Sequence, residues 1–161
     1  MRDFVIVTDS SCDLPGKMAD DLELVVLPLT VLMEGREYKN YLDEREITFA
    51  DFFSAIRSGA TATTSAVNTE AFVSEMRKIA DAGKDVLYLG FSTGLSNTYN
   101  AGAMACEELS SEYPDCKFLH VDTLCASLGE GLLVYLAVQQ KRLGKSIEEG
   151  RDFVEAIKLK I

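Results

Sequence analysis

The sequence has no tryptophan, only one histidine and four cysteines in 161 residues. The cysteines are Cys12, Cys106, Cys116 and Cys125. None of them forms a Cys-x-x-Cys pair, and His120 lacks metal-ligand spacing to any of them. We therefore predict no metal site and no cofactor. Unpaired cysteines are typical of a reducing compartment, so we expect four thiols and a cytoplasmic protein.

Long apolar runs are also missing. The longest, Leu132 to Val138, is far too short to span a membrane. Residues 1–7 run directly into a strand pattern, so we expect no secretory leader. Basic residues are outnumbered, with 16 Lys and Arg against 26 Asp and Glu, for a net charge of −10. Such a surface repels phosphate backbones and anionic lipids, so we predict no nucleic-acid or peripheral membrane binding. A small anion in a local pocket is still compatible with it.

Apolar runs of strand length alternate along the chain with amphipathic helical patterns. We expect strands at residues 4–8, 24–27, 29–33, 85–91 and 117–121. We expect helices at residues 48–56 and 126–143, one that begins at residue 68 or 69, one that follows the 92–96 loop and runs to 109, and one that begins at 146. A turn at Glu34-Gly35-Arg36 predicts a hairpin over residues 31–39. The alternation predicts an α/β fold, a mainly parallel sheet with helices on both faces.

Hydroxyl-rich segments follow the predicted strands. They are Asp9-Ser10-Ser11, Ser92-Thr93 to Ser96, Asp122-Thr123, and a loop Thr63-Thr64-Ser65 before a helix. Ligands of open parallel sheets bind outside the carboxyl ends of the strands, and hydroxyls with free helix amides hold anions there. These loops contain no Lys or Arg, which favours a carboxylate over a polyphosphate. The alternative is that these residues only cap helices, although clusters this large exceed what capping needs.

Gly90-Phe91-Ser92-Thr93-Gly94 matches the G-x-S-x-G nucleophile elbow between a strand and a helix. This makes a serine hydrolase with Ser92 as nucleophile the alternative function. Its partners do not fit, because His120 precedes Asp122 and lies in a predicted strand. We interpret Asp9, Ser10 and Asp122 as residues that order the loops near the pocket.

Several motifs, in order along the chain, resemble those of the DegV family. They are Thr8-Asp9-Ser10-Ser11-Cys12-Asp13-Leu14, Pro28-Leu29-Thr30-Val31, Thr64-Ser65, Ser92-Thr93-Gly94-Leu95-Ser96-Asn97-Thr98-Tyr99, and the segment from Val121 to Gly131. The sequence departs from the family pattern at Ala66 and Val67, where Gln and Pro are usual, and at Thr93 and Asn97.

The resemblance implies a protein, not itself an enzyme, that binds a long-chain fatty acid such as hexadecanoate and presents it to a fatty acid kinase for acyl-phosphate formation. It implies that Thr64 and Thr93 hold the carboxylate, with Ser92, Ser96 and Ser65 as secondary candidates. It also implies two domains. Residues 1–145 would form the first, and residues 146–161 would begin a helix leading to a second domain that the chain lacks and that would complete the site.

Overall fold

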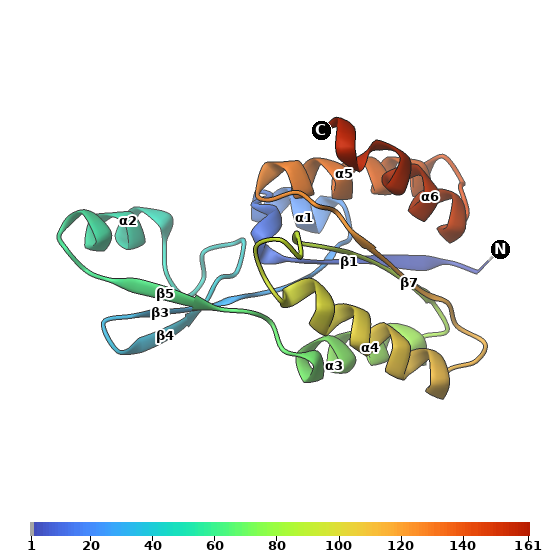
Figure 1. Cartoon of the computed structure of the whole chain (residues 1–161), viewed down its shortest axis with the longest axis horizontal. Helices are drawn as coiled ribbons and strands as arrows, with labels where there is room; N and C mark the ends of the chain where they lie inside the picture. Colours follow the sequence, from blue (N-terminus) through green and yellow to red (C-terminus); the bar gives the residue numbers. More distant parts are fainter. Residues whose placement is uncertain (1) are drawn as a thin grey trace.

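The computed structural model describes residues 2–161 and contains a four-stranded parallel sheet in the order β2-β1-β6-β7 (Figure 1). The strands are β1 (Phe4–Asp9), β2 (Val25–Leu27), β6 (Asp85–Gly90) and β7 (Phe118–Asp122). Each runs parallel to its neighbour, so all four carboxyl ends lie at one edge of the sheet. We call this sheet and its helices the body.

Helices cover both faces of the body, as predicted (Figure 1). One face carries α1 (Gly16–Asp21), α5 (Leu128–Arg142) and α6 (Ile147–Ile157), and the other carries α3 (Thr69–Asp81) and α4 (Thr98–Glu112). Two short 3-10 turns, η1 (Ser10–Cys12) and η2 (Lys158–Lys160), follow β1 and α6. A capping box between Ser146 and Glu149 begins α6. The predicted α/β class is confirmed.

The core has two parts, one on each face of the sheet, because strand side chains alternate in direction. On the central strand β6, Leu87 and Leu89 pack under α5 and α6, whereas Val86 and Tyr88 pack under α3 and α4. All four are fully buried. Full burial of such a side chain stabilises the fold by about 1.5–3 kcal/mol, so β6 anchors both layers.

A second sheet protrudes beyond the carboxyl edge of the body (Figure 1). Its antiparallel strands, in the order β4-β3-β5, are β3 (Thr30–Met33), β4 (Arg36–Lys39) and β5 (Ala62–Ser65), and α2 (Phe49–Arg57) joins β4 to β5. We call residues 30–65 the arm. The predicted hairpin is confirmed, with Glu34 and Gly35 at positive φ in its turn.

The prediction that residues 63–65 form a loop was wrong, because these residues lie in strand β5. Thr63 and Thr64 pair with Leu32 and Val31 of β3. Threonine fits a strand because its branched side chain packs well on a pleated sheet, a preference that the abundance of hydroxyls concealed.

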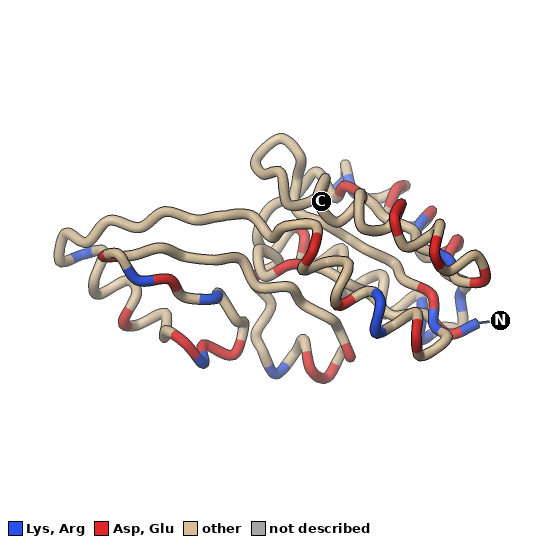
Figure 2. Tube along the Cα trace, turned by 90° about the horizontal axis from the view of Figure 1, so that it is seen from below, with Lys and Arg blue, Asp and Glu red and all other residues tan. Residues whose placement is uncertain are grey.

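Ser10 ties the arm to the body. Its Oγ accepts hydrogen bonds from the Leu29 amide at 3.0 Å and from Asn40 Nδ2 at 3.2 Å. Figure 2 shows acidic and basic residues distributed along the helices of the body and along parts of the arm. Within residues 2–161, no helix is both long and apolar enough to cross a membrane.

Candidate functional site

The polar loops after β1, β6 and β7 lie side by side at the carboxyl edge of the sheet. The Thr123 amide and hydroxyl donate to the Gly90 carbonyl at 3.2 and 2.8 Å, which joins the ends of β6 and β7. The Phe91 amide donates to Asp9 Oδ2 at 3.3 Å, which joins β1 to β6. The structure therefore brings together three of the four predicted hydroxyl-rich segments.

Asp9 is fully buried and holds its own loop in place. Its Oδ1 accepts from the Ser11 amide at 3.0 Å, which caps η1. Burial raises the pKa of Asp9, while the hydrogen bonds from Ser11 and Phe91 oppose that rise. Asp9 and Ser10, which binds the arm, therefore hold in place the buried part of the β1 loop beneath the exposed loops.

Ser92 begins a tight turn before α4. Its amide donates to the Cys125 carbonyl at 3.1 Å, and its Oγ accepts from the Gly94 amide at 3.2 Å. Its own hydroxyl hydrogen has no acceptor within residues 2–161, and the residue is 7% exposed. Ser96 is more occupied, because its Oγ accepts from the Thr98 amide at 3.1 Å and lies 2.9 Å from the Thr98 hydroxyl.

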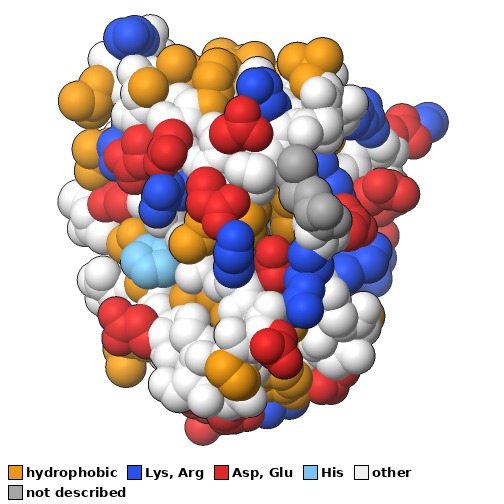
Figure 3. Space-filling view, turned by 90° about the vertical axis from the view of Figure 1, so that its right-hand side faces the viewer, with side chains coloured by type: hydrophobic (Ala, Val, Ile, Leu, Met, Phe, Trp, Pro, Cys, Tyr) orange, Lys and Arg blue, Asp and Glu red, His pale blue; other side chains and the backbone are white. Residues whose placement is uncertain are grey.

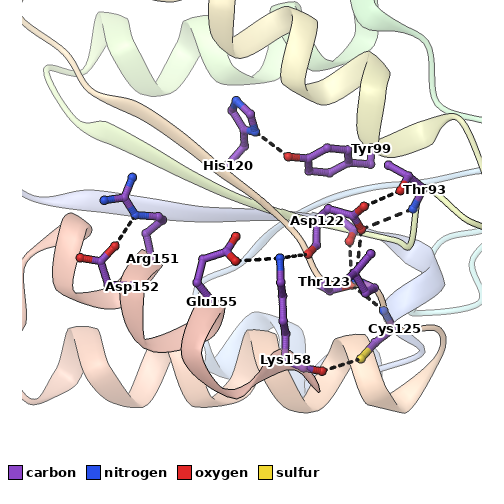
Figure 4. Close-up of polar contacts among 12 residues, drawn as sticks. Thr93, Tyr99, His120, Asp122, Thr123, Cys125, Arg151, Asp152, Glu155 and Lys158 are labelled. Carbon is purple, nitrogen blue, oxygen red and sulfur yellow. Dashed lines mark hydrogen bonds and ion pairs between the residues drawn. The ribbon is translucent and has the colours of Figure 1, made fainter. Parts of the chain in front are cut away.

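Thr93 and Asp122 face each other across the gap between the β6 and β7 loops (Figure 4). The Thr93 hydroxyl donates to Asp122 Oδ2 at 2.5 Å, and the Thr93 amide donates to Oδ1 at 3.3 Å. Asp122 Oδ1 also accepts from the Leu124 amide at 3.0 Å. Every partner of this carboxylate is a donor, and the Thr93 hydroxyl hydrogen is already engaged.

Lys158 places a cation beside Thr93 and Asp122, although the loops themselves contain no Lys or Arg. Lys158, at the start of η2, donates from Nζ to the Asp122 carbonyl at 3.0 Å and forms an ion pair with Glu155 at 2.7 Å (Figure 4). Its side chain is only 15% exposed. Sequence reasoning missed Lys158, because it lies 36 residues beyond Asp122 and no local pattern links the two.

Thr64 and Ser65 stand apart from these loops, on the arm. Both are exposed, and Thr64 shares a sheet face with Val31, its pairing partner on β3. Ser65 lines a groove of about 500 Å³ where the arm joins the body, and Thr64 and Thr93 are not among the residues that line it. Among the described residues, no hydrogen bond joins Thr64 or Ser65 to the Ser92–Ser96 loop.

The geometry does not assemble a hydrolase triad. His120 Nδ1 lies 2.7 Å from the Tyr99 hydroxyl, and no hydrogen bond among residues 2–161 joins its ring to Ser92. Partial burial lowers the pKa of His120, and the histidine reaches the surface on the face seen in Figure 3. Nothing in these contacts activates the Ser92 oxygen.

Glu130, in the first turn of α5, was not predicted as a site residue. It is fully buried, its Oε1 accepts from Thr8, and its Oε2 has no hydrogen-bond partner within residues 2–161. Burial, and then the nearby Asp9 charge, raise the pKa of Glu130 to about 10, so it is neutral at pH 7. The next residue, Gly131, lets α5 approach η1 closely, since a Cβ there would lie 2.4 Å from the Cys12 carbonyl oxygen.

The part of the chain that the structure describes contains no evident set of metal ligands. No three His, Cys, Asp or Glu side chains of residues 2–161 group closely enough to hold an ion. Burial raises the thiol pKa of Cys12 and of Cys106 to about 12, so neither is a ready thiolate ligand.

Comparison with known proteins points to one family. The family model described as "Uncharacterised protein, DegV family" matches residues 3–161. A DegV domain-containing protein of Clostridium perfringens is 44% identical over the whole chain, which covers 55% of that protein. Among solved structures, a DegV family protein from Thermus thermophilus, described by its fatty acid binding, has a TM-score of 0.85 and 33% identity, covering 98% of this chain and 54% of that one.

A Thermotoga maritima protein, whose structure is described as revealing a fatty acid binding function, has a TM-score of 0.83 and 29% identity. The match covers 97% of this chain and 55% of that protein. The chain thus spans about half the length of the relatives that it matches.

Proposed function

The chain belongs to the DegV family, and from that premise we propose that it binds a long-chain fatty acid and is not itself an enzyme. The observation that carries the proposal is the set of hydroxyl loops at the carboxyl edge of a fold shared with fatty-acid-binding relatives. A carboxylate needs donors, and Ser92 offers a free hydroxyl hydrogen in this set.

We propose that the head group lies between the Ser92–Ser96 loop and the arm, held by Ser92, Thr93 and Ser96 on one side and by Thr64 and Ser65 on the other. The arm extends from the same edge at which the loops end (Figure 1), which supports this placement. Asp9, Ser10 and Asp122 order the floor and wall of the site through the contacts described above.

The tail supplies most of the affinity in this proposal. A hexadecanoate chain buried at about 0.8 kcal/mol per methylene gains roughly 11 kcal/mol, from which association and ordering subtract several. The hydroxyl site then decides which end of the molecule lies at the loops. Leu124, Leu128 and Leu132 are 47%, 62% and 44% exposed near this edge, and we propose that a second domain packs against them and completes the pocket.

We further propose that the bound acid is presented to a fatty acid kinase, which transfers the γ-phosphoryl group of ATP to a carboxylate oxygen. In this proposal the carrier contributes no catalytic group. The kinase supplies the Mg²⁺ and the charge stabilisation that phosphoryl transfer requires. We expect the complex of the two to act in the cytoplasm.

Titration with a fluorescent hexadecanoate analogue tests the proposal. We expect saturable binding to this chain that unlabelled hexadecanoate displaces and that Ser92→Ala weakens. Absence of displaceable binding, both in this chain and in a chain extended by a second domain, would contradict it.

A further inference from the structure

We propose that Asp122 sets the charge selectivity of the head-group site, because it competes with an anionic ligand for the Thr93 hydroxyl hydrogen. This inference rests on the proposed function, since it concerns the same site. It assigns to Asp122 a role beyond ordering the loop, and it predicts that the site is tuned below its maximum affinity for a carboxylate.

The Thr93 hydroxyl can donate only one hydrogen bond. A threonine hydroxyl has one hydrogen and two lone pairs. In this structure the hydrogen of Thr93 Oγ1 is donated to Asp122 Oδ2. Only lone pairs then face a ligand, and a carboxylate also presents only lone pairs, so the two cannot form a hydrogen bond until the hydroxyl turns away from Asp122.

The negative charge of Asp122 also opposes an anionic ligand. A carboxylate bound to Thr93 would lie two hydrogen-bond lengths, roughly 5 Å, from the Asp122 carboxylate. At that distance two like charges repel appreciably even in water, and more strongly when the site is partly closed. An uncharged head group that carries its own donor, such as an alcohol, meets neither obstacle.

The Lys158 ammonium does not offset this charge. Lys158 contacts the Asp122 main-chain oxygen, and its charge is paired with Glu155 (Figure 4). The ammonium therefore does not neutralise the side-chain carboxylate directly. Asp122, Glu155 and Lys158 together carry two carboxylates and one ammonium, so the cluster has a net negative charge.

Asparagine in place of Asp122 would preserve the loop and release the Thr93 hydroxyl. Its Oδ1 can still accept from the Thr93 and Leu124 amides, so the loop keeps its backbone bonds. Its Nδ2 can donate to Thr93 Oγ1, which frees the hydroxyl hydrogen for the ligand. The substitution Asp122→Asn thus removes one charge and one competing acceptor without removing volume.

The experiment measures the affinity of this chain for hexadecanoate and for hexadecanol, which has the same tail and no charge, by calorimetric titration. For Asp122→Asn we expect hexadecanoate to bind about fourfold tighter or more, and hexadecanol to change less than about twofold. Asp152→Asn is the matched control, because it removes the same charge from an exposed position of α6 on the far side of Lys158 (Figure 4). It should change neither affinity.

The double variant Thr93→Val with Asp122→Asn tests whether the gain in affinity depends on the Thr93 hydroxyl. A purely structural role of Asp122 would not require that hydroxyl. Without the hydroxyl there is no hydrogen to release, so most of the gain should disappear. The inference is overturned, with the proposed function intact, if the wild-type chain binds hexadecanoate and Asp122→Asn does not tighten it or tightens hexadecanol equally. If the wild-type chain binds neither ligand, the same variants are compared in a chain extended by a second domain; if that chain binds neither ligand as well, the proposed function fails and this inference fails with it. Far-ultraviolet circular dichroism confirms that each variant is folded, and Asp122→Ser replaces Asp122→Asn if the latter is not.

Discussion

Glu130 lies wholly inside the protein, and its Oε1 accepts a hydrogen bond from Thr8 Oγ1 at 3.0 Å. The pair joins the start of α5 to the end of β1, directly below the loops of the candidate site. Burying a carboxyl with one oxygen that has no hydrogen-bond partner costs stability. This cost depends on whether the carboxyl is protonated, so it can be measured as a change of stability with pH.

We predict that this carboxyl makes the protein less stable as pH rises. The pKa of Glu130 is raised from 4.5 to about 10 in the folded state. The folded state therefore holds a proton that the unfolded state loses above about pH 4.5, and the free energy of unfolding falls between that pH and about 10 by up to ~1.4 kcal/mol per pH unit. Glu130→Gln removes the titration, so its unfolding free energy should fall less steeply from pH 5 to 9.

Urea denaturation at a series of pH values measures this slope. The control is Glu108→Gln, which removes an exposed glutamate of α4 and should leave the slope of the wild type unchanged. Equal slopes in the wild type and in Glu130→Gln would show that Glu130 is ionised in the folded protein.

Removing the Thr64 hydroxyl should weaken hexadecanoate binding. A net hydrogen bond contributes about 1 kcal/mol, so Thr64→Val should reduce the affinity roughly fivefold. Thr63→Val is the matched control, because neighbouring strand residues point to opposite faces of the sheet. Fluorescent fatty-acid titration compares the two, and equal effects in both would remove Thr64 from the proposed site.

Ser92 should not react as a nucleophile. A fluorophosphonate probe labels serines whose oxygen is activated by a base, and His120 is bonded to Tyr99 instead. We expect no covalent adduct by intact mass spectrometry after incubation with excess probe, with a known serine hydrolase as the positive control. Stoichiometric labelling that disappears in Ser92→Ala would favour a hydrolase over a carrier.

The exposed leucines of α5 should make this chain associate or bind a hydrophobic dye. Leu128 and Leu132 lie one helical turn apart, so they form a continuous apolar surface. Replacing both by glutamine should lower dye fluorescence and shift the size-exclusion profile towards the monomer. Leu143→Gln, at a 74% exposed leucine beyond the end of α5, should have little effect. A monodisperse wild-type chain that binds fatty acid as tightly as the Thermus thermophilus relative would contradict the proposed second domain.

The parallel sheet could be predicted from the sequence because its strands are buried on both faces and read as short apolar runs, as Val86 to Leu89 do. The convergence of Asp9, Ser92 and Asp122 followed from a general property of parallel sheets, that their carboxyl ends share one edge. Local pattern was sufficient for these features.

The arm and the positions of Glu130 and Lys158 could not be predicted without the three-dimensional structure. Strand β5 reads as a polar loop, because its pairing with β3 joins segments about thirty residues apart and leaves its threonines exposed. Glu130 and Lys158 lie on helices that follow β7. Their contacts with Thr8 and Asp122 cannot be predicted from the spacing of residues in the sequence.

Nuclear magnetic resonance of the 17.7 kDa chain tests the central claim most directly, because it detects weak as well as strong binding. Backbone amide spectra are recorded during titration with hexadecanoate. We predict saturable shifts of the amides of Ser92, Thr93 and Gly94 and of Thr64 and Ser65 on the arm, which would place the head group between the two. Absence of shifts, or shifts confined to the exposed leucines of α5, would contradict a fatty-acid carboxylate site at the carboxyl edge of this sheet.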